Sequence, residues 1–338
     1  MAIHIVRFLP RNAPGQTAVT NPPSAPQPDA SSGFQWGVLF DRHIAPLPVR
    51  AATTGEFLRE GQSLAEACRP SQATLSLDEV TLLSPVTANQ QFICQGVNYE
   101  SHVRESGMDP AAVPFNTIFT KASSCITGPH ADVVRPRHVR LLDHEIELGL
   151  VLKTDVRGPR EVRADALHEV LAGVTIVNDV SARDVQLPQA QFYKGKSYRT
   201  FGPVGPSLVL LTPAEWRLLP QLRMTLSVNG TVRQNDLCGA MIHKPHQTLT
   251  ELSALHDLQA GDLIATGTPA GCAARAPGKA AMFVARHFLS DEAKWRLFIA
   301  SGLKNPLYLQ PNDVMTLAIR TDDGQLDLGQ QRNRVVAA

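Results

Sequence analysis

Hydrophobic residues occur in many short runs that are separated by glycine, proline and small polar residues. Runs of this length that are rich in β-branched side chains predict strands. Helical spacing of apolar residues is rarer and predicts helices at 54–67, 163–171, 247–257 and 290–300. Many short strands with few helices predict a β-rich α+β fold, closed or rolled. The predicted strands are 3–9, 34–40, 92–98, 117–123, 144–152, 173–180, 207–211, 223–230, 262–269 and 313–321.

Two segments interrupt this pattern. Residues 10–33 hold six prolines and almost no charge, so we interpret them as an extended insertion. The runs on either side of it are predicted to pair as a hairpin. A second insertion is predicted at about 272–306. We place a small N-terminal domain at 1–85 and a larger domain at 86–338.

The composition favours a soluble globular protein. The chain has 338 residues, of which 43% are hydrophobic and 19% charged. Its 32 basic and 31 acidic side chains give no electrostatic reason to expect a nucleic-acid partner. No apolar run reaches the roughly 18 residues that a membrane helix needs. Five widely spaced cysteines without a C-x-x-C pair favour reduced thiols, and we expect a cytoplasmic protein.

Paired carboxylates give the strongest local chemical signal. Glu145 and Glu147 lie in a predicted strand, where alternate side chains share one face about 6.6 Å apart. Two carboxylates so close repel each other unless a cation lies between them or one is protonated. A hard divalent ion such as Mg²⁺ or Mn²⁺ would satisfy them. The alternative is a solvated strand face that alternates charged and apolar residues.

A second polar group follows the apolar run GVTIVN. Asp179 comes at the end of the predicted strand and suits a third metal ligand. Arg183 and Gln186 are three residues apart and would share a face of a helical turn, where they could bind a substrate carboxylate. The alternative is that Asp179 caps a helix and that Arg183 pairs with Asp184.

A third group could supply a general base. His102 and Glu105 are three residues apart and would meet on a helix. A carboxylate beside an imidazole orients the ring and raises its basicity, as activation of water requires. The alternative is an ordinary surface pair.

Lys121 and Lys196 each lie among strand and turn residues. Either could offset negative charge that develops on a substrate oxygen, although most lysines are simply solvated. The stretch TGTPAG at 266–271 offers free backbone amides but matches neither a phosphate-binding loop nor a dinucleotide fingerprint. The serine-hydrolase motif G-x-S-x-G is absent.

Taken together, the order of the motifs resembles that of the fumarylacetoacetate hydrolase family, from about residue 85 to 336. The resemblance implies a mixed β-sandwich roll around a metal site, usually in a homodimer. The motifs that carry it are NYxxHxxE, TKxSS, HExEL, NDVSARDxQ, GKSYxTFGPVGP, VNGxxRQ, GDLIATGTPAG and QRNRV.

The resemblance also implies roles for individual residues. Glu145, Glu147 and Asp179 match the family's ligands of Mg²⁺, Mn²⁺ or Ca²⁺. His102 and Glu105 match its water-activating pair. The remaining matches are residues that face the substrate: Lys196 beside the metal, and Lys121, Arg183, Gln186 and Thr268 in the same pocket.

The leading functional hypothesis is hydrolysis of a carbon–carbon bond in an acylpyruvate-type 2,4-diketo acid, such as a fumarylpyruvate-like compound. His102, held by Glu105, would deprotonate a water that attacks the 4-carbonyl, and pyruvate would be released. Two alternatives remain open. The same site could decarboxylate, isomerise or hydrate a 2-oxo acid, or the chain could be a catalytically silent family member. Arg199 and the two insertions depart from the family pattern and bear on substrate choice.

Overall fold

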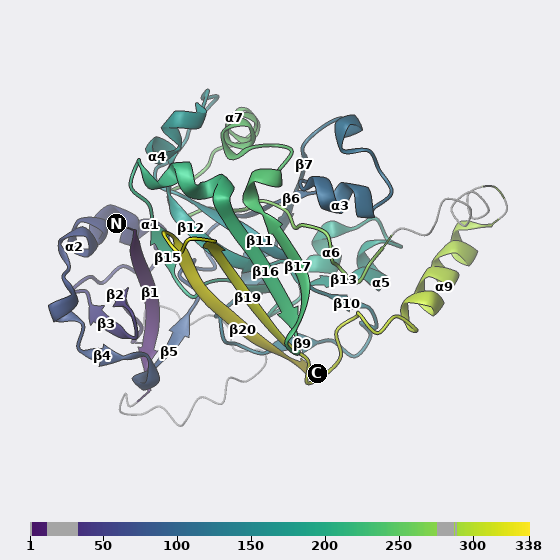
Figure 1. Cartoon of the computed structure of the whole chain (residues 1–338), viewed down its shortest axis with the longest axis horizontal. Coiled ribbons are helices and arrows are strands. Elements are labelled where there is room, and N and C mark those ends of the chain that lie inside the picture. Colours follow the sequence, from purple (N-terminus) through teal and green to yellow (C-terminus); the bar gives the residue numbers. More distant parts are fainter. Residues whose placement is uncertain (1, 12–32, 276–286, 288) are drawn as a thin grey trace.

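The computed structural model describes residues 2–11, 33–275, 287 and 289–338. Two sheets pack face to face at the centre of the molecule (Figure 1). The larger sheet has 11 strands, and β5 (Val80–Leu83) pairs with β1 beside its main path. That path runs β4 (Leu75–Ser76), β3 (His43–Pro46), β2 (Gln35–Phe40), β1 (Ile3–Pro10), β15 (Leu208–Leu210), β12 (Leu171–Asn178), β11 (Ile146–Leu152), β18 (Leu263–Ala265), β6 (Phe92–Gly96) and β7 (Thr117–Lys121).

The second sheet has five strands and covers β11 and β12 from one side. Two pairs of very short strands complete the strand set. The β-rich α+β fold predicted from the sequence is therefore confirmed. The second sheet runs β17 (Thr231–Leu237), β16 (Leu222–Val228), β19 (Val314–Thr321), β20 (Asp327–Ala337) and β9 (Val133–Arg135), and the short pairs are β10 (Leu142–Asp143) with β13 (Ser181–Ala182) and β8 (Ile126–Thr127) with β14 (Gly202–Pro203).

The central strands β11 and β12 are buried along their whole length. Leu148 on β11 belongs to the core between the two sheets, which also contains Leu226 and Leu317. Val151 points to the other face and packs in a second core that contains Trp36 and Phe57. Burial on both faces explains why these strands read as continuous apolar runs without alternation.

The N-terminal strands extend the larger sheet instead of forming a separate one. β1 pairs with β2 in antiparallel register, Ile5 opposite Val38, which confirms the predicted hairpin. Its other edge pairs with β15, Ile5 opposite Leu208. Residues 12–32 of the proline-rich insertion lie outside the described residues. The division at residue 85 stays a prediction.

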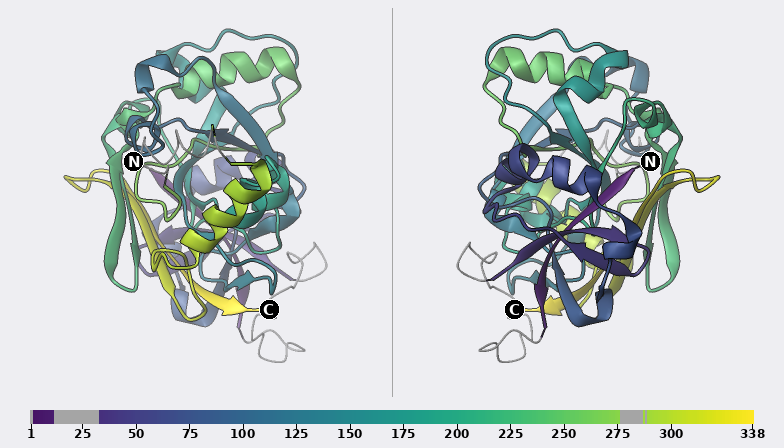
Figure 2. Two further views of the ribbon diagram at one scale, coloured as in Figure 1. Left: turned by 90° about the vertical axis from the view of Figure 1, so that its right-hand side faces the viewer. Right: turned by 90° about the vertical axis from the view of Figure 1, so that its left-hand side faces the viewer.

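The helices flank the sheets (Figures 1 and 2). The predictions at 54–67, 247–257 and 290–300 are confirmed within a few residues. The prediction at 163–171 is wrong in extent: a short helical turn ends at Val170, and Leu171 already begins the buried strand β12. The helices are α1 (Thr54–Glu60), α2 (Gln62–Ala67), α3 (Glu100–Glu105), α4 (Leu167–Val170), α5 (Arg183–Gln186), α6 (Phe192–Lys196), α7 (Pro245–Leu255) and α9 (Asp291–Gly302).

Helix α9 lies in the predicted second insertion and extends away from the two sheets (Figure 1). Residues 276–286 and 288 of the same insertion are outside the described residues.

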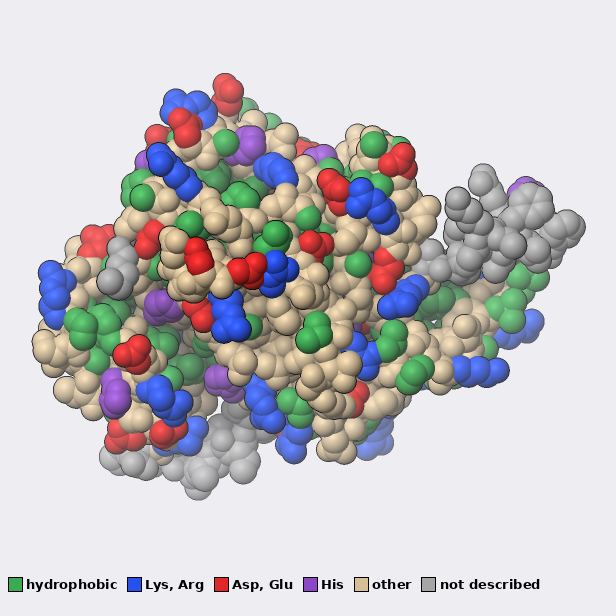
Figure 3. Space-filling model, viewed as in Figure 1, with side chains coloured by type: hydrophobic (Ala, Val, Ile, Leu, Met, Phe, Trp, Pro, Cys, Tyr) green, Lys and Arg blue, Asp and Glu red, His purple; other side chains and the backbone are tan. Residues whose placement is uncertain are grey.

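All five cysteines are free thiols. Among the described helices, none has the length and apolar character needed to cross a membrane. Acidic and basic side chains are interspersed on the face shown in Figure 3.

Candidate active site and metal centre

Three buried carboxylates meet where β11 begins and β12 ends. The two strands are antiparallel, with Ile146 opposite Asn178, so the residues beside this pair become neighbours. Glu147 lies on β11, Glu145 precedes the strand, and Asp179 follows β12. One carboxylate oxygen of each residue lies within 4.8 Å of the other two. The solvated strand face is therefore excluded for this motif, and the predicted cluster exists as a buried triad.

Two buried lysines neutralise part of this triad. The Nζ of Lys196 lies 2.5 Å from Glu145 Oε2 and 2.5 Å from Asp179 Oδ2. The Nζ of Lys121 lies 2.5 Å from Asp179 Oδ1 and 2.7 Å from the carbonyl oxygen of Phe201. Both predicted lysines thus reach the site, and each donates to its carboxylates.

Arg183 holds Glu145 from the other side. Its Nη2 donates to Glu145, its Nε to Asp143 at 2.9 Å, and its Nη1 to Gln186 at 2.8 Å. Arg183 and Gln186 share a helical turn, as predicted, and all three guanidinium nitrogens have protein partners. The alternative pairing of Arg183 with Asp184 is wrong, because both oxygens of Asp184 accept backbone amides of residues 140–141. Binding of a substrate carboxylate by Arg183 and Gln186 stays a prediction.

The charges around the triad are unevenly shared. Burial alone would raise the pKa of Glu145, but the cations of Arg183 and Lys196 outweigh it and lower that pKa far below its usual range. Burial raises the pKa of Glu147 well above its usual value, and the charges of Asp179 and Glu145 add to the effect. Among the residues that the structure describes, its carboxylate accepts one hydrogen bond, from the amide of Gly267 at 2.8 Å. Glu147 is the least neutralised member of the triad.

These residues fit a divalent cation. Four buried carboxylates, including Asp143, face the three buried cations Arg183, Lys121 and Lys196, which leaves one negative charge in excess when all are ionised. A divalent ion held by Glu145, Glu147 and Asp179 would turn this excess into one positive charge. Oxygen ligands suit Mg²⁺, Mn²⁺ or Ca²⁺. A site with net positive charge suits an anionic substrate.

Helix α3 carries the predicted His102–Glu105 pair. His102 Nδ1 lies 3.9 Å from Glu105 Oε2, which is beyond hydrogen-bond length. This Nδ1 is buried and has no hydrogen-bond partner among the described residues. The Glu105 carboxylate instead accepts the amide of Gly271 at 2.9 Å and faces Arg275 Nε at 3.2 Å. Burial opposes ionisation of Glu105, yet His102, the Gly271 amide and Arg275 together lower its pKa.

Two supporting residues were missed from the sequence. Gln234 accepts the amide of Ile146 at 3.0 Å and donates to Thr268 Oγ1 at 2.8 Å, so it joins β17 to the strand that carries Glu147. Thr268 in turn donates to the carbonyl oxygen of Ile146 at 2.9 Å. Asp143 accepts the amides of Ala273 at 2.8 Å and Ala274 at 3.0 Å. Gln234 lies in the motif VNGxxRQ and Asp143 directly precedes HExEL, but their partners are distant in sequence.

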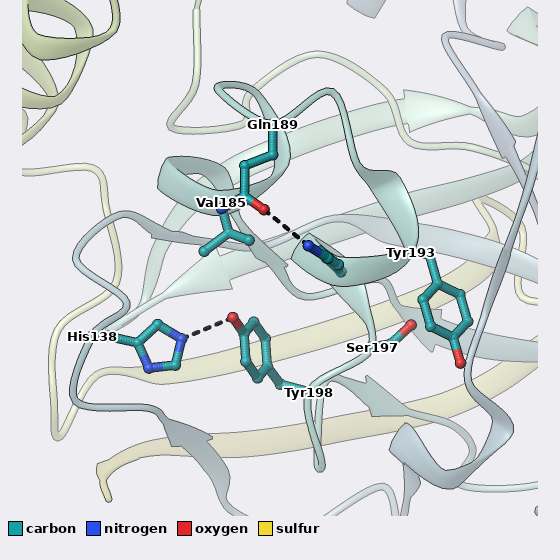
Figure 4. A pocket seen from close by; sticks show the side chains of 7 residues that line it. His138, Val185, Gln189, Tyr193, Ser197 and Tyr198 are labelled. Carbon is teal, nitrogen blue, oxygen red and sulfur yellow. Dashed lines mark hydrogen bonds between the residues drawn. The ribbon is translucent and has the colours of Figure 1, made fainter. Parts of the chain in front are cut away.

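A separate cavity of about 460 Å³ lies beside α6, next to Lys196 along the chain. Figure 4 shows its hydrogen-bonded His138 and Tyr198 side chains, which are 2.8 Å apart. None of the triad residues or the His102–Glu105 pair lines it. Its lining residues are His138, Val185, Gln189, Tyr193, Lys194, Ser197 and Tyr198.

The sequence is similar to those of two oxaloacetate tautomerases. Mitochondrial oxaloacetate tautomerase FAHD2A of Bos taurus is 36% identical over 230 residues, which cover 66% of this chain and 71% of that protein. Oxaloacetate tautomerase YisK of Bacillus subtilis is 36% identical over 224 residues, covering 64% of this chain and 72% of its own length.

Solved structures with a similar fold cover nearly the whole chain. Fumarylacetoacetate hydrolase from Exiguobacterium antarcticum superposes with a TM-score of 0.67 at 28% identity, covering 99% of this chain and 100% of that one. Maleylpyruvate hydrolase from Sphingobium sp. SYK-6, solved with manganese(II) and pyruvate, has a TM-score of 0.67 at 23% identity over 99% of each chain and supports the fold. Residues 91–336 match the family model "Fumarylacetoacetate (FAA) hydrolase C-terminal". The chain therefore belongs to the fumarylacetoacetate hydrolase family.

Proposed function

We propose that this protein catalyses enolisation of a short 2-oxo acid, and that keto–enol tautomerisation of an oxaloacetate-type substrate is its reaction. The observation that carries the proposal is the buried Glu145–Glu147–Asp179 triad beside the His102–Glu105 pair. The two tautomerases that are 36% identical over about two thirds of the chain support the choice of reaction.

The residues of the chain divide the chemistry between them. A divalent cation held by the triad would polarise the 2-oxo and carboxylate oxygens of the substrate. Lys196, buried beside Glu145 and Asp179, offsets negative charge as it develops on the 2-oxygen. His102 has its Nδ1 toward Glu105, so its Nε2 is the atom that accepts the C3 proton and returns it to oxygen. The proton changes place, and no water is consumed.

Hydrolysis of an acylpyruvate-type 2,4-diketo acid is the second candidate. The His102–Glu105 pair favours it, because a carboxylate-oriented imidazole can deprotonate a water. Attack of that water on the 4-carbonyl would break the carbon–carbon bond and release a carboxylic acid and pyruvate. The two reactions share the enolate and differ in whether water is admitted.

Two assays test the proposal. The first follows the enol absorbance of oxaloacetate in the presence of Mg²⁺. The second uses a coupled reaction to detect pyruvate released from a panel of 2,4-diketo acids. Tautomerisation predicts faster keto–enol equilibration without net loss of oxaloacetate, abolished by chelator. Stoichiometric pyruvate from a diketo acid would favour hydrolysis instead. The variant His102→Ala should lose the activity, whereas His256→Ala, at an exposed histidine after α7, should retain it. No Mg²⁺-dependent turnover of any substrate would overturn both candidates.

Two further expectations remain proposals. We infer a homodimer from the family resemblance, and sedimentation velocity would test it by mass. We also keep the cytoplasm as the expected location, with a small 2-oxo acid as the partner and no nucleic acid. Fractionation of cells that express the full chain would test the location.

A further inference from the structure

Three groups lie around the carboxylate of Glu105: the amide of Gly271, the ring of His102 and the guanidinium of Arg275. Its Oε2 accepts the amide of Gly271 at 2.9 Å, while His102 Nδ1 stays 3.9 Å away. Its Oε1 faces Arg275 Nε at 3.2 Å. The proposed chemistry requires Glu105 to orient His102 through Nδ1, yet this Nδ1 has no hydrogen-bond partner in the part of the chain that the structure describes. Arg275 and Gly271 hold the carboxylate in an arrangement in which the His102–Glu105 pair is open.

The segment that precedes Arg275 is bound to Asp143 through two backbone hydrogen bonds. Asp143 accepts the amides of Ala273 and Ala274 at 2.8 and 3.0 Å. Gly271 has a φ of +110°, and a Cβ there would lie 1.9 Å from the carbonyl oxygen of Arg233, so only glycine allows its amide to reach Glu105. Residues 271–274 thus connect Glu105 on α3 with Asp143, which shares Arg183 with Glu145 of the triad, and Arg275 follows directly in the chain.

Arg275 differs from the other cations of the site. Lys121, Lys196 and Arg183 are buried, and their nitrogens are bonded to triad residues or their neighbours. The side chain of Arg275 is 57% exposed, and its partner within the described ranges is Glu105. A guanidinium has a planar set of five donors, so Arg275 has donors left for a second carboxylate.

We infer that Arg275 binds the second carboxylate of a dicarboxylic 2-oxo acid, and that this contact releases Glu105 to accept a hydrogen bond from His102 Nδ1. The inference rests on the proposed function and names its substrate class. A substrate carboxylate and Glu105 are chemically equivalent partners for Arg275, so one can replace the other. A monocarboxylic acid cannot make the exchange, and with it the pair stays open.

The test compares the full chain with Arg275→Gln and Arg275→Lys. Arg163→Gln is the matched control, because Arg163 is also exposed and paired with its own carboxylate, Asp165 at 3.0 Å. Calorimetry with Mg²⁺ measures binding of malate, which has a second carboxylate arm, and of oxalate, which offers the chelating head alone. A bidentate contact predicts about 10- to 100-fold weaker malate binding in Arg275→Gln, with oxalate unchanged. Arg275→Lys should lie between, and Arg163→Gln should match wild type.

Turnover supplies a second readout. Arg275→Gln should raise KM and lower kcat for oxaloacetate, but leave Mg²⁺-dependent deuterium exchange at C3 of pyruvate at the wild-type rate. Equal losses for malate and oxalate, or no loss for either, would overturn the inference. If wild-type protein turns over no oxaloacetate but the malate–oxalate difference persists, the proposed reaction fails and the carboxylate subsite stands. Thermal melts confirm that each variant is folded.

Discussion

The Nε of Arg183 lies 2.9 Å from Oδ2 of Asp143, and both side chains are buried. Burial alone would raise the pKa of Asp143, yet Arg183 and the neighbouring His144 lower it, so the carboxylate is ionised. Removing Asp143 leaves the buried Nε of Arg183 and the amides of Ala273 and Ala274 without their acceptor. Asp143→Ala should therefore lower the free energy of unfolding by about 3 kcal/mol. Urea titration monitored by circular dichroism measures it.

An exposed pair provides the control for this prediction. Arg163 and Asp165 lie 3.0 Å apart, with 69% and 75% of their side chains exposed. Water screens such a pair, so Asp165→Ala should leave the free energy of unfolding close to the wild-type value. Equal losses in the two variants would contradict the special role of Asp143.

The two glutamates of the triad should respond oppositely to amide substitution. Glu145 is bonded to Arg183 and Lys196, so Glu145→Gln should destabilise the metal-free protein. The pKa of Glu147 is raised by burial and by the charges of Asp179 and Glu145, so Glu147→Gln removes repulsion and should leave the metal-free melting temperature unchanged or higher. Both variants should lose the stabilisation that Mg²⁺ gives to wild type. Melting curves with and without Mg²⁺ test this; a Mg²⁺ shift retained in Glu147→Gln would remove Glu147 from the ligand set.

Replacement of the proposed base should separate catalysis from metal binding. His102→Ala should lower kcat by about 100-fold or more, the usual contribution of a general base. The triad oxygens are untouched, so Mg²⁺ affinity measured by calorimetry should stay near the wild-type value. Full activity in this variant would sink the role of His102, and a large loss of Mg²⁺ affinity would indicate a metal-site role instead.

Stability should decrease as the pH falls through about 6.5, in part because of His4. Burial lowers the pKa of His4, against the opposing charges of Asp327 and Glu215. The unfolded chain then binds a proton that the folded chain binds less readily, so stability rises with pH across this range. His4→Gln should show a shallower dependence between pH 5 and 7 in urea titrations, whereas His43→Gln, at an exposed position, should parallel wild type.

Short-range patterns predicted the acid triad well. The apolar runs that became β11 and β12 are continuous because both faces are buried, and their ends bring Glu147 and Asp179 together. The predicted strand at 144–152 begins two residues late, at Ile146. Glu145 lies before the strand, where its carbonyl oxygen accepts the amide of Asp179 at 2.9 Å.

Two long strands of the second sheet were not predicted, because their buried side chains are partly polar. On β17 and β20, Gln234, Gln331 and Asn333 are buried and bonded to backbone carbonyls or side chains far away in sequence. Such residues break the alternation on which a strand prediction depends. The Arg275–Glu105 contact was also not predicted, because the two residues are 170 positions apart and no local spacing indicates it.

The pairing of β1 with β15 has a consequence for any shortened version of this protein. The family match begins at residue 91, and β1 lies wholly before it. A chain trimmed to the match would expose the backbone amides and carbonyls of β15 along a bare, hydrophobic sheet margin. Unprotected margins of this kind recruit further strands. The N-terminal strands therefore cover a sheet edge that would otherwise promote aggregation. A chain without them should be insoluble, even though it keeps all the residues of the candidate active site.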